Sequence, residues 1–318
     1  MTEQEKMLAG DLYFPSDKTL SALRKQCRMQ LDELNTTCQS DHKKRTRLLK
    51  GLFGSTGKRL YIESSFKCDY GENIHVGENF FANFNCVILD AAKVTIGDNC
   101  MIAPQVGLYT ATHPLDPVQR ATGIEFAKPI TIGDNCWIGS NVSIMDGARI
   151  GNNCKIGSNV IIRNSIIKDN VTILDNCVIG KKGFGFFPKS NENMRYPHIG
   201  IVIINENCEI GCGATIDRGS MSNTEIGKNT FLDNQIHIAH NVKVGENTII
   251  AGQVGIAGSS IIGNNVKIGG QAGISGHLRI GDNVDIAGGS GVIKSIPNNS
   301  KVMGYPAKNI REFLKESR

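Results

Sequence analysis

Aliphatic residues recur at every sixth position over long stretches of this chain. Every sixth residue from Ile226 to Val292 is Ile, Leu or Val, and the same step runs from Ile132 to Ile162. A helix of 3.6 residues per turn would scatter these residues around its surface, and a simple strand repeats every two residues. A period of six therefore predicts short strands joined by sharp turns, each sending one aliphatic side chain to a common axis.

The tetrapeptide Ile/Val-Gly-x-Asn begins at positions 226, 244, 262 and 280, which are 18 residues apart. Three hexads per coil make a triangular parallel β-helix, with neighbouring coils about 4.8 Å apart. The residue after each ladder position is usually Gly, Ala or Ser, which we attribute to a tight corner with unusual backbone angles. The sequence thus predicts an all-β fold for most of its length.

Both ends of the chain depart from this ladder. Residues 1–57 are predicted to be helical, because Thr2 with Glu5 suits a capping box and residues 20–34 have an amphipathic pattern. Residues 298–318 are predicted to form a C-terminal cap ending in a helix. A β-helix needs such caps, because its end coils otherwise expose unpaired strand edges.

Two long segments interrupt the coils. The coils of residues 58–147 are broken by 109–129, and those of residues 148–297 are broken by 181–197. Both segments contain prolines and glycines where the hexad fails, so we expect loops that project from corners.

Composition and charge narrow the functional classes. The 318 residues include 36 glycines, six tyrosines and one tryptophan, which argues against a bundle of large amphipathic helices. The net charge of +5 is spread out, and the basic stretch 42–50 fits a solvated helix face, so no nucleic-acid partner is indicated. No apolar run approaches the roughly 20 residues of a transmembrane segment, and the start MTEQEK is no signal peptide. We therefore expect a cytoplasmic protein.

Ten cysteines are present, and half of them occupy one place in the repeat. Those that follow an asparagine are Cys100, Cys136, Cys154, Cys177 and Cys208. A recurrent position predicts a small, buried, reduced side chain. No CxxC pair occurs, so we expect no metal site and no tightly bound cofactor.

Residues 18 apart stack vertically, which brings glycines over polar residues. His240 lies beneath Gly258 and Gly276. The neighbouring columns run from His237 through Gly255, Gly273 and Gly291, and from Asn234 through Gly252, Gly270 and Gly288. Stacks of glycines that each end at a polar residue suggest a groove for a long thin ligand. Alternatively, the glycines relax the corners or let subunits pack.

A carboxylate precedes His240 at an unusual position. Asp233 occupies a corner position that otherwise holds Gly, Ala or Ser from 227 to 287. A carboxylate near an imidazole can orient the ring and support its positive charge during proton transfer, so Asp233 is a candidate partner of His240. His237 is interpreted as a surface or interface residue. His277 lies two coils above His240, displaced by one position.

The first part of the chain, from residue 1 to about 145, resembles the maltose and galactoside O-acetyltransferases. The motifs that carry the resemblance are EKMLAG (5–10), FGSTG (53–57), CDYGENIHVGENFFANFNCVILD (68–90), YTATHPLDP (109–117) and ITIGDNCWIGS (130–140). The resemblance implies a left-handed parallel β-helix that trimerises, with active sites between subunits and acetyl-CoA as donor.

The same resemblance implies site residues in this part. His113 would be the general base toward a sugar hydroxyl. Asp69 and Asn83 match acceptor-side positions. Ser140 matches the residue whose backbone amide stabilises the oxyanion, and Trp137 lies in the same donor-side segment.

From about residue 148 to its end, the chain resembles the UDP-3-O-acylglucosamine N-acyltransferase of lipid A synthesis. The motifs are GFGF (183–186), IGCGATIDRG (210–219), LDNQIHIAHNV (232–242) and GQAGISGH (270–277). The resemblance implies His240 as general base, Gly258 as oxyanion donor and an acyl carrier protein as the donor's carrier. The matching site segments also contain Asp233, Asn234, Gly276 and His277.

Each resemblance is incomplete. The first family ordinarily continues with further coils and a basic tail for the coenzyme, and the second begins with a uridine-binding domain that residues 1–130 do not show. The chain is therefore interpreted as a fusion of two enzymes. The leading hypothesis is a homotrimeric acyltransferase acting on a sugar or UDP-sugar. Its alternatives are a β-helix scaffold without a complete active site and, less favoured, a metal lyase like the γ-type carbonic anhydrases, which needs three converging histidines.

Overall fold

The computed structural model describes residues 1–187 and 192–316. By its internal contacts the chain divides into two compact units, Met1–Cys154 and Lys155–Arg318. No helix in the described part of the chain is long and apolar enough to cross a membrane.

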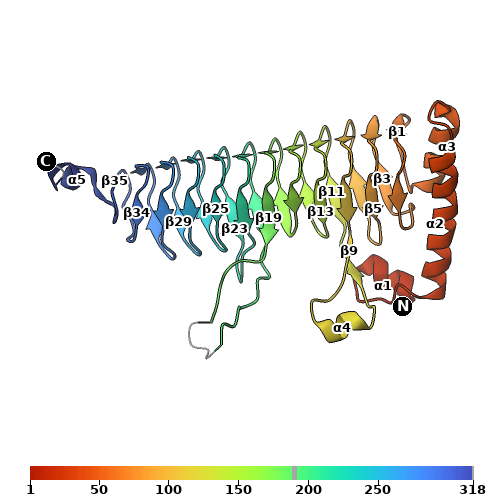
Figure 1. Cartoon of the computed structure of the whole chain (residues 1–318), viewed down its shortest axis with the longest axis horizontal. Coiled ribbons are helices and arrows are strands. Elements are labelled where there is room, and N and C mark those ends of the chain that lie inside the picture. The colour runs from red at the N-terminus through yellow and green to blue at the C-terminus, as the bar shows by residue number, and fades with distance from the viewer. Residues whose placement is uncertain (188–191, 317–318) are drawn as a thin grey trace. The chain divides into compact units, whose positions relative to one another are not determined.

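Three helices begin the first unit, as the sequence predicts (Figure 1). They are α1 (Glu3–Ala9), α2 (Lys18–Thr36) and α3 (His42–Leu52). The Thr2 hydroxyl accepts a hydrogen bond from the Glu5 N–H at 3.2 Å, and the Glu5 carboxylate accepts one from the Thr2 N–H at 2.8 Å. The predicted capping box is therefore present.

The coils of the first unit form three parallel sheets. One contains β1 (Leu60–Ile62), β4 (Phe80–Ala82), β7 (Met101–Ile102) and β12 (Trp137–Ile138). The second contains β3 (Ile74–Val76), β6 (Val94–Ile96), β11 (Ile130–Ile132) and β14 (Arg149–Ile150). The third contains β2 (Lys67–Cys68), β5 (Val87–Leu89), β8 (Gly107–Tyr109) and β13 (Ser143–Met145).

The second unit repeats this arrangement. One sheet contains β15 (Lys155–Ile156), β18 (Thr172–Ile173), β21 (Glu209–Ile210), β24 (Phe231–Leu232), β27 (Ile249–Ile250), β30 (Lys267–Ile268), β33 (Asp285–Ile286), β35 (Lys301–Met303) and β36 (Lys308–Asn309). The second contains β17 (Ser165–Ile167), β20 (Val202–Ile204), β23 (Thr224–Ile226), β26 (Lys243–Val244), β29 (Ile261–Ile262) and β32 (Arg279–Ile280). The third contains β16 (Ile161–Ile162), β19 (Val178–Lys181), β22 (Thr215–Asp217), β25 (His237–Ile238), β28 (Gly255–Ile256), β31 (Gly273–Ile274) and β34 (Gly291–Val292).

The predicted β-helix is confirmed in both units. From β23 to β34 the strands pair in parallel across an 18-residue step, so that His237 pairs with Gly255, and Gly255 in turn with Gly273. The last strand, β36, pairs antiparallel with β35. The ladder residues form the core, and Ile238 and Ile256 are wholly buried. The short helix α5 (Ile310–Glu316) follows the last coil, and residues 317–318 of the predicted C-terminal helix lie outside the described residues.

The glycine at each corner has a different cause from the one that the sequence suggested. Gly227 does not have a left-handed backbone, but a Cβ there would lie 2.4 Å from the carbonyl carbon of Gly245 in the next coil. The left-handed residue of the same corner is Asn229, with φ of 55°. Close stacking of coils therefore requires the glycine, while asparagine, which tolerates positive φ, makes the turn.

The cysteines of the repeat are buried and free, as predicted. They also have a hydrogen-bonding role, because the Cys208 thiol donates to the Gly227 carbonyl at 3.0 Å. In the next coil the Thr230 hydroxyl donates to the Gly245 carbonyl at 2.8 Å. At these two corners the side chain therefore also satisfies a corner carbonyl.

The predicted loop 109–129 contains regular structure. It holds β9 (Ala111–Thr112) and β10 (Phe126–Ala127), which pair antiparallel, and the short helix α4 (Pro117–Ala121) between them. The hexad fails there because the chain leaves the coils, and the two strands hydrogen-bond each other outside the parallel sheets.

The second predicted loop, 181–197, is mostly irregular. Residues 188–191 lie outside the described residues, and the segments on either side of them meet at an antiparallel bridge between Phe186 and Arg195. We call these segments, residues 181–187 and 192–198, the Gly-Phe arm.

Candidate active sites

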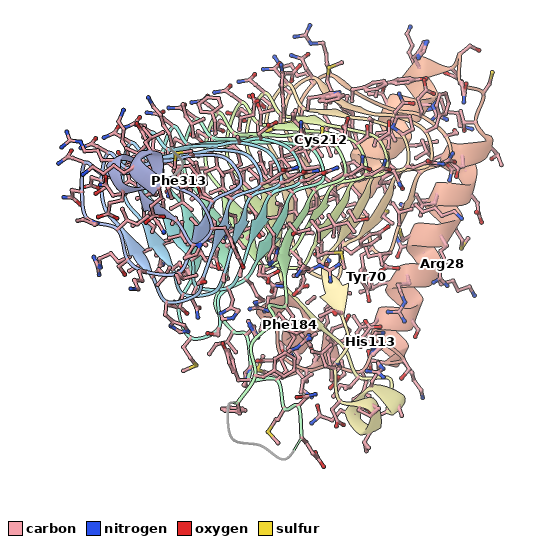
Figure 2. The ribbon with its side chains drawn as sticks, turned by 60° about the vertical axis from the view of Figure 1, so that its left-hand side comes forward. Arg28, Tyr70, His113, Phe184, Cys212 and Phe313 are labelled. Atoms are coloured by element: carbon pink, nitrogen blue, oxygen red, sulfur yellow. The ribbon has the colours of Figure 1, made fainter. Side chains whose placement is uncertain are left out.

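His113 follows β9 and is exposed in this chain (Figure 2). Its Nδ1 lies 3.1 Å from the Ile124 carbonyl oxygen, and its Nε2 lies 3.5 Å from Oε1 of Glu125. The backbone carbonyl fixes one ring nitrogen as a donor and directs the other toward a carboxylate. Such an arrangement orients the ring as a general base requires.

Tyr13, near the N-terminus, secures Glu125. The buried Tyr13 hydroxyl donates to Oε2 of Glu125 at 2.7 Å, and the two residues exchange backbone hydrogen bonds of 2.9 and 3.0 Å. Burial, and then the hydrogen bond to Glu125, raises the pKa of Tyr13, so the hydroxyl stays a donor. Sequence analysis identified neither residue, because both lie outside the hexads.

Asp69 belongs to the same neighbourhood. Burial raises the pKa of the Asp69 carboxyl, Arg24 opposes this, and Glu125 adds to it. The backbone at Asp69 is held by the buried Asp90, whose carboxylate accepts the N–H groups of residues 69, 70 and 71 at 2.7 to 2.9 Å. Burial raises the pKa of Asp90 to about 6.

The other candidates of the first unit lie elsewhere on the coils. Trp137 is 45% exposed on β12, with Ser140 just after that strand. Asn83 follows β4 of the same sheet, and its side-chain oxygen accepts the Phe84 N–H. His113 follows β9, which pairs with β10 outside the three sheets. No interaction among the described residues joins His113 to Trp137 or Ser140.

In the second unit Gly258 lies against His240, as the 18-residue step predicts. A Cβ at Gly258 would lie 2.6 Å from Cε1 of His240. One coil further, the His277 N–H donates to the Gly258 carbonyl at 3.0 Å, and a Cβ at Gly276 would lie 3.1 Å from that oxygen. Only glycine at position 258 leaves room for the His240 imidazole, because any Cβ there would overlap the ring.

His240 is buried among polar and aromatic groups. Its Nε2 lies 3.3 Å from the Tyr196 hydroxyl, and its Nδ1 lies 3.2 Å from Nδ2 of Asn241. Burial lowers the pKa of His240, against the opposing effects of Asp217 and of a hydrogen bond to the Phe184 backbone. The neutral ring, which is the form that can accept a proton, is therefore favoured.

Asp233 does not orient His240 within this chain. Asp233 is exposed at the corner before β25, beside Gly252, whereas His240 lies at the corner after that strand. The carboxylate that acts on His240 is Asp217, which is wholly buried and accepts a hydrogen bond from Lys181. Asp217 follows the ladder residue Ile216 and so occupies the same hexad position as Asp233.

The remaining polar candidates lie around these corners. Asn234 is exposed, and its side-chain oxygen accepts the Cys212 N–H at 2.8 Å. His277 is exposed and has a left-handed φ of 61°. His237 is half-buried, with Nδ1 2.8 Å from the Thr215 hydroxyl.

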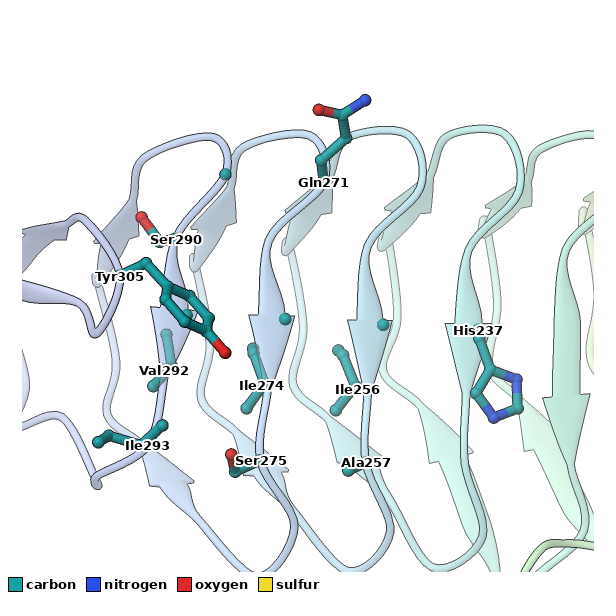
Figure 3. A pocket seen from close by; sticks show the side chains of 14 residues that line it. His237, Ile256, Ala257, Gln271, Ile274, Ser275, Ser290, Val292, Ile293 and Tyr305 are labelled. Atoms are coloured by element: carbon teal, nitrogen blue, oxygen red, sulfur yellow. The ribbon is translucent and has the colours of Figure 1, made fainter.

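A groove of about 500 Å³ follows one of the three predicted glycine columns (Figure 3). Its floor includes Gly255, Gly273 and Gly291, with His237 at one end and Tyr305 at the other. A Cβ at Gly255 or Gly273 would meet nothing within 4 Å, so these glycines leave open space. At Gly291 a Cβ would lie 2.0 Å from the Tyr305 ring, which closes the groove.

Across residues 1–187 and 192–316, no group of three or more His, Cys, Asp or Glu side chains is arranged to hold a metal ion. The titratable side chains of both sites are connected to their neighbours by hydrogen bonds and ion pairs.

Two family models match the chain. The maltose acetyltransferase hexapeptide capping motif matches residues 6–57, and the bacterial transferase hexapeptide (six repeats) matches residues 129–164 and 223–258. The galactoside O-acetyltransferase of Escherichia coli is 40% identical over 150 residues, which are 47% of this chain and 74% of that enzyme.

Solved structures resemble the chain as well. A hexapeptide-repeat acetyltransferase from Vibrio cholerae, complexed with acetyl coenzyme A, aligns with a TM-score of 0.51 and 34% identity over 55% of this chain and 93% of that one. The UDP-N-acetylglucosamine acyltransferase from Campylobacter jejuni aligns with a TM-score of 0.50 and 26% identity over 57% of this chain and 69% of that one.

Proposed function

This chain belongs to the hexapeptide-repeat acyltransferase family, and we propose that it transfers an acyl group from a thioester to a sugar hydroxyl or amine with histidine as general base. The observation that carries this proposal is His240, a buried imidazole with lowered pKa that touches the bare backbone of Gly258. Base and oxyanion donor are both needed for acyl transfer, and here they are neighbours.

In the second unit the acceptor nucleophile would take the place of the Tyr196 hydroxyl at Nε2 of His240. Its lone pair attacks the thioester carbonyl carbon while His240 accepts its proton. The Gly258 N–H has no hydrogen-bond partner among the described residues, so it is free to stabilise the oxyanion. When the carbon–sulfur bond breaks, the proton returns to the leaving thiolate.

The glycine groove suits the acyl chain of the donor. It is lined mainly by glycine and aliphatic residues and is closed at one end by Tyr305. The proposed donor of this unit is therefore a long-chain thioester on an acyl carrier protein, and the proposed acceptor is a UDP-linked amino sugar, as for the N-acyltransferases that this part resembles.

In the first unit His113 would deprotonate a sugar hydroxyl, with Glu125 stabilising the imidazolium. Acetyl-CoA is the proposed donor, in line with the coenzyme that the Vibrio cholerae relative binds. Trp137 and Ser140 lie on another sheet from His113, so we propose that a neighbouring subunit of a homotrimer supplies them. Asp69 and Asn83 are proposed to contact the acceptor.

The test is which thioester the protein consumes. Acetyl-CoA with maltose and a long-chain acyl carrier protein with UDP-3-O-acylglucosamine are supplied separately, and thiol release is measured. His113→Ala is expected to slow the first reaction by about 10²–10⁴ and His240→Ala the second, each leaving the other unchanged. Wild-type protein that consumes neither thioester contradicts the proposal.

A scaffold without catalysis is the second candidate. It is favoured by the separation of His113 from Trp137 and Ser140 within one chain. Calorimetric titration with acetyl-CoA distinguishes the acyltransferase from the scaffold. A scaffold that has lost its donor site gives no heat at high protein concentration.

A further inference from the structure

The two glycines of the GFGF motif receive the rings that surround His240. A Cβ at Gly183 would lie 2.6 Å from Nε2 of His198 and 2.8 Å from Cβ of His240, and a Cβ at Gly185 would lie 2.2 Å from the Tyr196 ring. The phenylalanines pack elsewhere, because Phe184 and Phe186 both lie under the Arg195 guanidinium. The Gly-Phe arm is therefore built to hold His198 and Tyr196 against His240.

These three rings pack against one another. Tyr196 stacks on His198 with centroids 5.2 Å apart and an interplanar angle of 13°. His240 meets both rings edge-on, with centroids 5.2 Å from His198 and 5.7 Å from Tyr196. A group that replaces the Tyr196 hydroxyl at His240 would therefore lie close to the ring of His198.

His198 has an unused hydrogen-bond acceptor. Only 7% of the residue is exposed. Its Nδ1 lies 3.0 Å from the Tyr196 carbonyl oxygen, so Nδ1 carries the proton and Nε2 has a lone pair. Nε2 is buried and has no hydrogen-bond partner among the described residues. A buried acceptor without a donor is costly, so this nitrogen is expected to be satisfied by a ligand.

We propose that His198 selects a primary amine over a hydroxyl as the acyl acceptor at His240. The inference rests on the proposed function of the second unit and adds to it a residue that determines specificity. A hydroxyl has one hydrogen, which His240 takes. An amine has two, so the second can donate to Nε2 of His198.

The second N–H also fits the course of the reaction. The amine lone pair forms the bond to the thioester carbonyl carbon, one N–H proton passes to His240, and the carbon–sulfur bond breaks. The thiolate leaves with that proton. The other N–H is never transferred and becomes the amide N–H of the product, still bonded to His198. Burial lowers the pKa of His198, which keeps its ring neutral and its lone pair free.

The experiment compares two acceptors that differ in one group: a UDP-linked 3-O-acylated sugar with an amine at carbon 2, and the same sugar with a hydroxyl there. With a long-chain acyl carrier protein as donor, His198→Ala is expected to lower kcat/KM for the amine by about 10- to 100-fold and to change that for the hydroxyl by less than about threefold. His198→Gln, which keeps an acceptor atom, is expected to restore the preference. Met194→Ala is the control, since this side chain is exposed on the same arm.

Equilibrium binding of both sugars without donor provides the second measurement. Equal losses for both acceptors in His198→Ala, or a preference for the amine that survives this substitution, overturns the assignment of His198 while the proposed function stands. Wild-type protein that binds neither sugar and shows no turnover overturns both. Binding that favours the amine only when residue 198 is His or Gln supports the proposal, even where turnover is absent.

Discussion

His113 and His240 differ in how much of a site their own chain builds around them. The His113 side chain is 46% exposed and faces Glu125, while His240 is 7% exposed and packs against two rings of the Gly-Phe arm and the backbone of Gly258. His240 follows β25 of the third sheet, whereas His113 follows β9, which pairs with β10 outside the three sheets. The difference arises from the segments that leave the coils. Residues 109–129 pair with Tyr13, whereas the Gly-Phe arm packs two rings against His240.

This contrast separates two ways of completing an active site. Around His240 the proposed base, the proposed oxyanion donor and the rings that cover them come from one chain, and burial lowers the pKa of the imidazole. Around His113 the described residues join only the proposed base and the Glu125 carboxylate, and none of their interactions reaches Trp137 or Ser140. We therefore expect the second unit to depend on its own packing, and the first to depend on a neighbouring subunit.

The largest effect is expected from a substitution that disrupts the His240 site and leaves the His113 site intact. Gly258→Ala places a Cβ 2.6 Å from Cε1 of His240, which is too close for two carbon atoms. The ring must therefore move by about 1 Å, which costs on the order of 10²-fold in rate. Acyl transfer from the acyl carrier protein is measured, with maltose acetylation as the internal reference. Gly51→Ala, whose Cβ meets nothing within 4 Å, is the control, and unimpaired turnover by the Gly258 variant contradicts the proposed geometry.

The groove gives the next effect. Gly273→Leu projects a side chain into open space, so the protein should fold while the groove is blocked. Long-chain donors are expected to lose about tenfold or more in kcat/KM, since each buried CH₂ contributes about 0.8 kcal/mol, and short-chain donors should change little. A panel of acyl carrier protein thioesters of increasing length measures this, and a uniform loss at every length would exclude the groove as the acyl site.

A moderate effect is expected at the His113 site. Tyr13→Phe removes the hydrogen bond to Glu125, which is worth about 1.5–3 kcal/mol for a charged acceptor. Glu125 then holds the imidazolium less well, and kcat/KM for maltose acetylation should fall roughly tenfold. The Tm is recorded alongside, and the His240-dependent reaction is the control. A parallel loss in both reactions would indicate a general defect in folding.

The smallest effect is a shift in pH dependence. Burial lowers the pKa of His240 below 6.5, and Asp217 partly opposes this. Asp217→Asn removes the opposing charge, so the pKa falls further and the acidic limb of the kcat/KM profile moves to lower pH, by less than about one unit. The other titratable groups near this site, His277, Lys181 and Lys182, are unchanged in this variant. A limb that moves to higher pH would show that Asp217 does not face His240.

The sequence predicted the coil geometry well because each hexad is a local rule. The stacking of Gly258 on His240 follows from counting 18 residues, and the structure has it. The reason for the corner glycines was predicted wrongly, because adjacent coils approach within 2.4 Å of a virtual Cβ, and a single coil does not show this. The left-handed turn residue, Asn229, lies two positions further on.

The carboxylate of the His240 site shows where residue counting fails. Asp233 and Asp217 occupy equivalent hexad positions, but the regular 18-residue ladder from 227 to 287 includes only Asp233. The chain leaves the ladder twice between residues 179 and 224, so the number of residues per coil changes there. Thr215 pairs with His237 across 22 residues instead of 18, and only the strand pairing shows that Asp217 lies beside Ala239, next to His240.

The sequence by itself determined the three-sided coils, the buried aliphatic ladder, the family and the stack that includes His240. These follow from short-range periodicity, since each residue's neighbours in the next coil lie a constant number of positions away. Tertiary structure alone decided that His198 and Tyr196 cover His240, that Asp217 acts on it and that Tyr13 secures Glu125. Those contacts are made by segments without a repeat, whose positions depend on which side chains pack when the chain returns to the coils.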